Sequence, residues 1–210
     1  MKEMFEKIKL CIFDVDGVLV NSRNLHFPAT SLALYDYGFI YTREQDESYG
    51  TIPTIEKLNL IAESGGIEFK DVESIWNLKD DYACRLFDES ILVNPNIKEL
   101  FETIKSKDIF IALGSNARYS FLEKVISKLE ISGLVDHIAS AQGMKPKPDP
   151  FMYVSAMEKF NVSPDQTIIF EDSEVGKKAA YASKANVYEV SFYDELSVKT
   201  LTKQRSKTMI

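Results

Sequence analysis

The chain has 210 residues, of which 45 % are hydrophobic, and it contains 13 Phe and 10 Tyr. This is enough apolar mass for a folded core and excludes a disordered chain. The length fits one main domain with a smaller inserted or appended subdomain. The formal net charge of −7 argues against a nucleic-acid partner, because nucleic-acid binders need a basic footprint. An anionic substrate would therefore have to be attracted locally, by a metal ion and a few lysines.

The cysteines and the first residues of the chain bear on the cellular compartment of the protein. Cys11 and Cys84 provide no disulfide framework, and Cys11 lies in an apolar run where a buried side chain is expected. Residues 1–9 mix Lys and Glu and lack the apolar stretch of a signal peptide. No segment has the about 18 uninterrupted apolar residues of a membrane span. We therefore expect a cytoplasmic protein with no membrane partner.

The pattern along the chain predicts one helical segment followed by alternating strands and helices. Residues 8–13 form an apolar run that predicts a first strand. Between residues 22 and 88, apolar residues recur at helical spacing with breaks at glycines and at Pro53, which predicts three to five helices. Helices are then predicted over 97–105, 119–129, 150–160 and 176–183, and strands over 109–113, 137–140, 167–170 and 187–190. The basic stretch 199–207 is expected to be a frayed terminus.

This alternation predicts an α/β fold with a doubly wound parallel sheet and helices on both faces. Residues 1–21 and 89–210 would form the main domain, and residues 22–88 an inserted helical subdomain. Ligands bind such sheets at the carboxyl ends of the strands, near the switch in strand order. Polar segments follow four of the predicted strands: 14–17, 114–116, 145–150 and 171–173. We therefore expect the functional site at this edge of the sheet.

Asp14 and Asp16 stand two residues apart at the end of the first predicted strand. Residues i and i+2 of an extended segment share a face, so both carboxylates can approach one metal ion and one substrate. Gly17 lets the backbone turn and lets a ligand come close. One carboxylate can act as a nucleophile, and the other can protonate a leaving group and then activate water. A plain turn is the alternative, whereas an EF-hand loop is excluded because its glycine belongs at the sixth position.

Ser115 and Asn116 precede a predicted helix. A hydroxyl and free backbone N–H groups at a helix N-terminus bind phosphate oxygens, although either residue could simply be the N-cap. Lys145 lies in a segment stiffened by prolines, where a fixed ammonium could neutralise a carboxylate and phosphoryl oxygens. An exposed loop lysine is the alternative. Lys147 is expected to point the other way.

Glu171, Asp172 and Ser173 follow a predicted strand and open a predicted helix. An acidic helix N-terminus needs no further function, because it complements the helix dipole. Mg²⁺ prefers hard oxygen ligands, usually one or two carboxylates with waters and substrate phosphate. Asp14, the backbone carbonyl of Asp16 and Asp172 could supply three ligands. Glu171 would then be a direct ligand or a neighbour of the ligands.

In order and spacing, these segments resemble the motifs of the haloacid dehalogenase-like (HAD) superfamily. The matching residues are Asp14-Val15-Asp16-Gly17-Val18-Leu19, then Ser115, then Lys145 in Lys-Pro-x-Pro-Asp-Pro, then Glu171-Asp172-Ser173-x-x-Gly176. The resemblance spans about residues 8–192, and the helical insert is similar to the cap of the phosphoglycolate phosphatase and β-phosphoglucomutase branch. It implies a Rossmann-like core (1–21 and 89–210) with a mobile α-helical cap (22–88).

The resemblance also implies roles. Asp14 would be the nucleophile and Asp16 the general acid/base, while Ser115 and Lys145 would stabilise the phosphoryl group. Gly17 and Asn116 would join Ser115 and Lys145 in binding the substrate. Mg²⁺ would be held by Asp14, the Asp16 backbone carbonyl, Asp172 and Glu171. An acid at position 16 points to phosphate esters, because an ester leaving group needs a proton donor and a halide does not.

The implied function is a Mg²⁺-dependent phosphatase that acts on a small phosphorylated metabolite, of the sugar phosphate or phosphoglycolate type, through an aspartyl-phosphate. A sugar phosphomutase is the first alternative, but Pro53 stands where such mutases carry an arginine that clamps a second phosphate. A catalytically silent binding protein on the same fold is the second. A monomer or a homodimer is expected. The residues that would select the substrate stay open; the candidates are His26, Tyr37, Arg43, Tyr49, Lys79, Tyr82 and Arg118.

Overall fold

The computed structural model describes residues 7–50 and 52–203. The chain forms two compact units, of which one is Ser22–Leu92 and the other comprises the described residues before and after it. The sequence placed the end of the helical segment at residue 88. The structure extends it, because helix α5 (Val72–Ser90) continues for two residues beyond that position.

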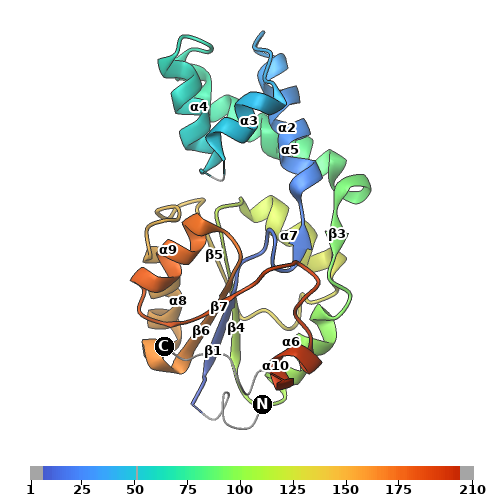
Figure 1. The fold of residues 1–210 in the computed structure, drawn as a ribbon, viewed down its shortest axis with the longest axis vertical. Helices are drawn as coiled ribbons and strands as arrows, with labels where there is room; N and C mark the ends of the chain where they lie inside the picture. Colours follow the sequence, from blue (N-terminus) through green and yellow to red (C-terminus); the bar gives the residue numbers. More distant parts are fainter. Residues whose placement is uncertain (1–6, 51, 204–210) are drawn as a thin grey trace. The chain divides into compact units, whose positions relative to one another are not determined.

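The main unit is built on a parallel sheet of five strands in the order β5-β4-β1-β6-β7 (Figure 1). The strands are β1 (Leu10–Phe13), β4 (Phe110–Ser115), β5 (His137–Ser140), β6 (Thr167–Glu171) and β7 (Asn186–Glu189). Phe13 of β1 is in register with Leu113 of β4 on one side and with Phe170 of β6 on the other. The order reverses at β1, so the predicted doubly wound α/β fold is confirmed and β1 is its switch point.

Helices cover both faces of this sheet (Figure 1). On one face, Leu10 and Ile12 pack with residues of α8 (Phe151–Phe160) and α9 (Glu174–Ala182). On the other face, the ring of Phe13 stacks on Phe170 at 4.4 Å and lies 4.8 Å from Phe101 of α6 (Ile97–Lys105). Alternate residues of β1 therefore pack into two apolar layers, one on each face of the sheet. Because both faces are covered, the whole strand is buried and its sequence is a continuous apolar run.

Shorter elements connect these parts. A 3-10 turn, η2 (Pro164–Gln166), precedes β6, and helix α7 (Tyr119–Lys128) joins β4 to β5. β2 (Val20–Asn21) pairs with β3 (Leu92–Val93) in a two-stranded sheet. The expectation of a frayed terminus from residue 199 was wrong for its first part, because Val198–Lys203 form helix α10 and Leu201 is buried. Residues 204–207 lie outside the described residues.

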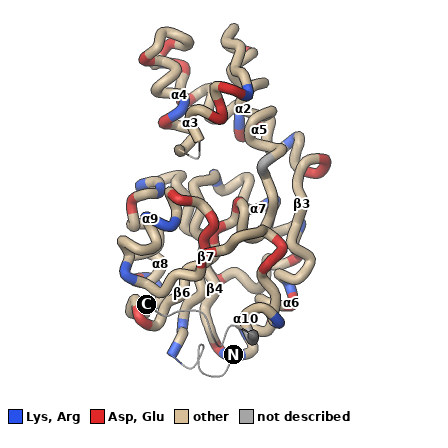
Figure 2. The backbone as a smooth tube through the Cα atoms, viewed as in Figure 1, with Lys and Arg blue, Asp and Glu red and all other residues tan. Residues whose placement is uncertain are grey.

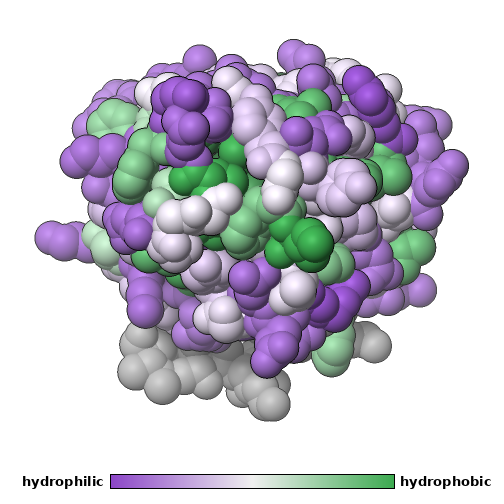
Figure 3. Space-filling view, turned by 90° about the horizontal axis from the view of Figure 1, so that it is seen from above, coloured by the Kyte–Doolittle hydropathy of each residue, from purple (hydrophilic) through white to green (hydrophobic). Residues whose placement is uncertain are grey.

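The second unit, Ser22–Leu92, is helical, as predicted. Its described helices are α2 (Arg23–Tyr35), α3 (Arg43–Tyr49), α4 (Thr54–Glu63), the 3-10 turn η1 (Phe69–Asp71) and α5. A small core that includes Leu34, Leu58 and Ile75 holds them together. Seen from above, hydrophobic residues appear in patches among hydrophilic ones (Figure 3).

Charged residues of both signs are interspersed along the chain (Figure 2). Within the described residues, no helix combines the length and the apolar character needed to cross a bilayer.

Candidate active site

Three adjacent strands of the sheet end in polar residues. Asp14 comes directly after β1, and its backbone N–H still donates to the carbonyl of Phe170, at 2.9 Å. Ser115 is the last residue of β4, and Glu171 is the last residue of β6. All three are buried. Because β1 lies between β4 and β6 in a parallel sheet, these side chains meet at one edge, where the sequence placed the site.

A buried lysine joins two of these carboxylates. The Nζ of Lys147 lies 2.6 Å from Oδ1 of Asp14 and 2.5 Å from Oε1 of Glu171. Burial alone would lower the pKa of this lysine, but the charges of Asp14 and Glu171 outweigh it and raise the pKa well above its usual value. Lys147 is therefore a permanent cation held between two carboxylates.

This geometry corrects the expectation about Lys145. The side chain of Lys145 is 74 % exposed and its Nζ lies 3.5 Å from Asp149, whereas the side chain of Lys147 is only 4 % exposed. The pattern Lys-Pro-x-Pro occurs twice in overlap, beginning at 145 and at 147. Spacing alone could not choose between the two. The structure brings Lys147, which was expected to point away, into the position expected of Lys145.

The loop after β4 fixes the backbone of Lys147. Oδ1 of Asn116 accepts a hydrogen bond from the N–H of Lys147 at 2.9 Å. The Oγ of Ser115 accepts from the N–H of Ala117 at 3.1 Å, and the Oγ of Ser140, at the end of β5, donates to the carbonyl of Ala117 at 2.5 Å. Ser115 and Asn116 thus order the turn that would face a phosphate group, and Asn116 also anchors the lysine segment 31 residues away in sequence.

Glu171 has both carboxylate oxygens engaged. Its Oε1 accepts from Lys147 and, at 2.9 Å, from the hydroxyl of Tyr153. Its Oε2 accepts from the N–H of Ser173 at 3.1 Å and from the hydroxyl of Ser173 at 3.2 Å. A carboxylate offers about four acceptor sites, so these hydrogen bonds fill them. Of the two readings left open by the sequence, the structure favours Glu171 as a neighbour of the metal ligands.

Asp172 differs from Glu171 in this respect. Its Oδ1 is buried and has no hydrogen-bond partner among the described residues. A buried carboxylate oxygen without a partner is costly unless a cation meets it. Burial, followed by the charge of Glu171, raises the pKa of Asp172 to about 6.

The surroundings of Asp172 fit a divalent cation. Carboxylate oxygens of Asp14, Glu171 and Asp172 lie within 4.8 Å of one another. Burial raises the pKa of Asp14, with Lys147 opposing and the charges of Glu171, Asp172 and Asp16 adding to the rise. Four carboxylates and one ammonium leave a formal charge of −3 in a buried space. Hard oxygen donors with excess negative charge are the donor set that Mg²⁺ and similar ions prefer.

The turn after Asp14 brings Asp16 and Gly17 to the same edge of the sheet, beside Asp14 and Asp172. Asp16 forms a β-bridge with Val20, and the N–H of Gly17 donates to the carbonyl of Val20 at 2.7 Å. Gly17 has φ of +86°, and a Cβ there would overlap the carboxylate of Asp172. Asp16 lies close enough for its charge to raise the pKa of both Asp14 and Asp172. Gly17 is therefore required by the turn and by the carboxylate beside it.

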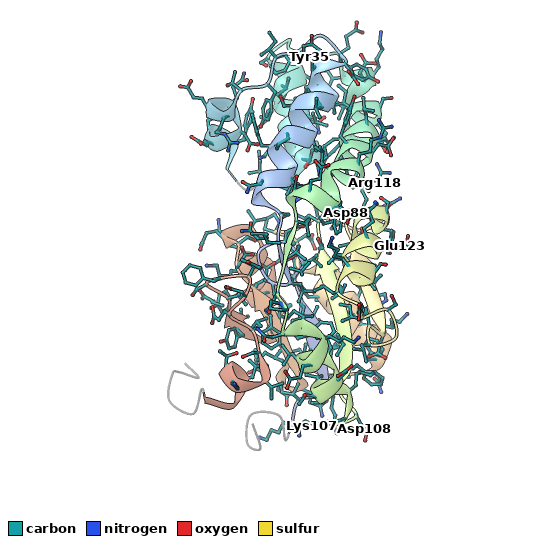
Figure 4. All side chains as sticks on the ribbon, turned by 90° about the vertical axis from the view of Figure 1, so that its right-hand side faces the viewer. Tyr35, Asp88, Lys107, Asp108, Arg118 and Glu123 are labelled. Carbon is teal, nitrogen blue, oxygen red and sulfur yellow. The ribbon has the colours of Figure 1, made fainter. Side chains whose placement is uncertain are left out.

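Arg118, a candidate for substrate selection, stands where α7 begins, three residues after Ser115 (Figure 4). Lys107 and Asp108, which were not candidates, lie at the opposite end of the sheet, just before β4. In the helical unit, the Nζ of buried Lys79 lies 3.4 Å from Nδ1 of His26. The sequence analysis missed two residues of the site, Lys147 and Tyr153. The second Lys-Pro-x-Pro match was a signal for Lys147, and the sequence held none for Tyr153, an aromatic residue on an amphipathic helix.

Comparison with known proteins identifies the class. The family model described as haloacid dehalogenase-like hydrolase matches residues 11–190. The chain belongs to this family, which confirms the resemblance drawn from the motifs. The match contains the site described above and, apart from Leu10 at the start of β1, all of the strands.

Individual relatives within this family include a phosphatase and a phosphomutase. The chain is 32 % identical to a protein of Thermotoga maritima named phosphorylated carbohydrates phosphatase, over 80 % of this chain and 78 % of that protein. It is 30 % identical to the β-phosphoglucomutase of Bacillus subtilis, over 82 % of this chain and 78 % of that protein. A crystal structure of CbbY from Rhodobacter sphaeroides in complex with phosphate shares the fold, with a TM-score of 0.79 and 21 % identity over 93 % of this chain and 99 % of that one.

Proposed function

We propose that this chain is a phosphatase that removes the phosphoryl group from a small phosphorylated metabolite, of the sugar phosphate or phosphoglycolate type, with Mg²⁺ as cofactor. The class, a phosphoric monoester hydrolase, agrees with the family and with relatives that are named as phosphatases. The observation that carries the proposal is the buried ammonium of Lys147 on Asp14, beside Oδ1 of Asp172, which has no hydrogen-bond partner in the part of the chain that the structure describes.

The arrangement gives each residue a task in phosphoryl transfer. Asp14 would attack phosphorus and form an aspartyl-phosphate, and Lys147 holds its Oδ1 and so orients the carboxylate. Asp16 would donate a proton to the leaving oxygen and then remove one from the attacking water. The ammonium of Lys147 would also offset charge on the phosphoryl oxygens. Ser115, Asn116 and Gly17 shape the backbone that would face these oxygens.

The metal would be held by Asp14 and Asp172, with the backbone carbonyl of Asp16 as a further donor. When bound, Mg²⁺ supplies positive charge that neutralises the phosphate oxygens and the carboxylates around them. Glu171, whose acceptor sites are filled, would hold Lys147 rather than bind the ion directly.

A sugar phosphomutase is the second candidate, because a β-phosphoglucomutase is 30 % identical to this chain. Pro53 at the start of α4 argues against it, since a proline cannot clamp a second phosphate. Thr51, in the same segment, lies outside the described residues. The cytoplasmic location and the monomeric or homodimeric state stay predictions.

The test is phosphate release from a panel of phosphorylated metabolites, with Mg²⁺ and with EDTA. The panel should hold phosphoglycolate, hexose and pentose phosphates, and β-glucose 1-phosphate with glucose 6-phosphate formation followed in parallel. Asp14→Asn keeps the shape of the side chain and removes the nucleophile. Asp165→Asn is the matched control, because Asp165 is exposed in η2, at the amino end of the sheet.

We expect Mg²⁺-dependent release that is lost in Asp14→Asn and kept in Asp165→Asn. Isomerisation of β-glucose 1-phosphate without net release would assign the chain to the mutases. Silence of the wild-type protein in both assays would favour the non-catalytic binding protein.

A further inference from the structure

Tyr153 is a buried tyrosine whose hydroxyl reaches the site from the helix layer. It lies in the first turn of α8 and is fully buried. Its hydroxyl donates to Oε1 of Glu171 at 2.9 Å, the same oxygen that accepts from Lys147. The Nζ of Lys147 also lies 5.2 Å from the centre of the Tyr153 ring. Tyr153 therefore touches both members of the Lys147–Glu171 pair.

The hydroxyl of Tyr153 keeps its proton and donates a hydrogen bond to Glu171. Burial raises the pKa of Tyr153 well above its usual value, and the charges of Glu171 and Asp14 add to the rise against the opposing effect of Lys147. The proton therefore stays on the Tyr153 oxygen, and Oε1 of Glu171 accepts the hydrogen bond. Tyr153 therefore gives Oε1 of Glu171 a neutral donor beside the ammonium of Lys147.

The fold leaves space for this contact at two glycines. A Cβ at Gly114 in β4 would lie 2.8 Å from Cε1 of Tyr153. A Cβ at Gly176 in α9 would overlap the carboxylate of Glu171. The Tyr153 ring thus packs against the backbone of β4 at Gly114, and the Glu171 carboxylate packs against the backbone of α9 at Gly176.

We propose that Tyr153 is a positioning residue whose hydroxyl holds Glu171 in the orientation in which Glu171 and Asp14 share the ammonium of Lys147. The proposal rests on the proposed phosphatase function for its kinetic readout. Without the hydroxyl, Oε1 of Glu171 keeps Lys147 as its one hydrogen-bond partner among the described residues and attracts it more strongly. The lysine is then drawn from Asp14 toward Glu171, away from the nucleophile and the phosphoryl group.

The first experiment compares Tyr153→Phe with Tyr188→Phe. Both changes remove a tyrosine hydroxyl that donates to a glutamate, but Tyr188 bonds Glu195 at 3.0 Å, outside the site. Tyr153→Phe keeps the ring and therefore the packing on Gly114. We expect kcat to fall about tenfold in Tyr153→Phe, with KM changed less than about twofold, because a hydrogen bond to a charged group is worth about one power of ten or more. Tyr188→Phe should leave both constants within about twofold.

The second experiment separates positioning from packing. In a Glu171→Gln background the carboxylate charge is gone, so the hydrogen bond from the Tyr153 hydroxyl to residue 171 is weaker and orients it less. Tyr153→Phe should then lower kcat by less than about threefold, against about tenfold in the wild-type background. An equal loss in both backgrounds would mean that Tyr153 acts through packing alone, and would overturn the proposal.

The third readout needs no turnover. Beryllium trifluoride with Mg²⁺ mimics a phosphoryl group on a carboxylate, and the ¹⁹F resonance of a fluorine near Lys147 reports that donor. We expect this resonance to shift in Tyr153→Phe and to stay in place in Tyr188→Phe; an unchanged resonance in Tyr153→Phe overturns the positioning role.

This readout also keeps the two proposals apart. If the wild-type protein forms the complex but hydrolyses no member of the panel, the proposed function fails and the ¹⁹F shift still decides the role of Tyr153. If the wild-type protein hydrolyses a substrate and Tyr153→Phe matches it in kcat, only the positioning role fails. Absence of the complex in the wild-type protein, together with no hydrolysis of any member of the panel, would overturn both.

Discussion

Lys145 and Lys147 form a matched pair for testing the site, since each is a lysine followed by proline and only two residues separate them. We predict that Lys147→Met strongly lowers both activity and stability, whereas Lys145→Met leaves both nearly unchanged. Methionine keeps much of the length of the side chain and removes only the charge and its donors. The comparison therefore isolates the buried ammonium.

The magnitude follows from the partners of each lysine. Lys147→Met leaves Asp14 and Glu171 buried without their cation, and an uncompensated buried charge costs about 3–5 kcal/mol. Glu171 keeps its bonds to Tyr153 and Ser173, which favours the lower end, about 3 kcal/mol. In a chain of this size, that lowers Tm by about 6–12 °C. Loss of a positioned cationic donor should lower kcat by about 10²–10³.

The loss of stability should depend on pH. Burial already raises the pKa of Asp14 while Lys147 opposes it, so removing the lysine raises that pKa further. When Asp14 takes up a proton, it becomes neutral, and part of the free-energy cost of burying its charge is removed. Thermal unfolding of Lys147→Met should therefore show a larger deficit against the wild-type protein at pH 8 than at pH 6.

Lys145→Met should change stability by less than about 0.5 kcal/mol, as exposed substitutions usually do, and its kcat should stay within about twofold. The assays are Mg²⁺-dependent phosphate release and thermal unfolding followed by circular dichroism. Equal losses in the two variants, or a larger loss in Lys145→Met, would refute the assignment of Lys147 to the site.

Three further changes test other parts of the same edge. Gly17→Ala should cost about 1–2 kcal/mol in thermal unfolding and weaken the response to Mg²⁺, because φ is positive and the Cβ meets Asp172, whereas Gly133→Ala has open space and should be neutral. Mg²⁺ at 100 times its Kd should add about 2.7 kcal/mol to the free energy of unfolding, reversed by EDTA. The pKa of Asp172 is raised from 3.8 to about 6 in the metal-free fold, so that fold loses stability as pH rises through about 6, and the gain from Mg²⁺ should be larger at pH 7.5 than at pH 5. Asn116→Ala removes the acceptor for the N–H of Lys147 and should lower kcat about tenfold, while an unchanged kcat would show that the lysine segment needs no such anchor.

Much of the fold was predictable because its elements carry local signals. The strand over 137–140 and the helix over 97–105 were placed with their observed bounds, and the other core elements within one or two residues. Apolar runs between turn residues mark buried parallel strands, and the 3.6-residue period marks the helices. The short pair β2 and β3 and the helix α10 were missed. Two-residue strands have no periodicity, and α10 depends on the burial of Leu201, which composition does not reveal.

The site was predictable where chemistry follows a strand directly. Asp14, Ser115 and Glu171 are fixed by the ends of β1, β4 and β6, so the order of elements was enough to bring them together. Glu171 was placed correctly, but its four hydrogen bonds could not be foreseen. Those bonds come from a loop, a helix and the turn after β6, and decide whether it binds a metal or a lysine.

The choice between the two lysines was made by residues far from them in sequence. Residues 145–150 offer two nearly equivalent registers, and local stiffness from proline is the same for both. What distinguishes them is that Asp14 and Glu171 present two buried carboxylates, 133 and 24 residues away from Lys147, while Asn116 fixes the backbone at that residue. A buried carboxylate pair without a cation is far costlier than an exposed lysine without a partner. The fold therefore selects the lysine that reaches both carboxylates, and leaves the other in solvent beside Asp149.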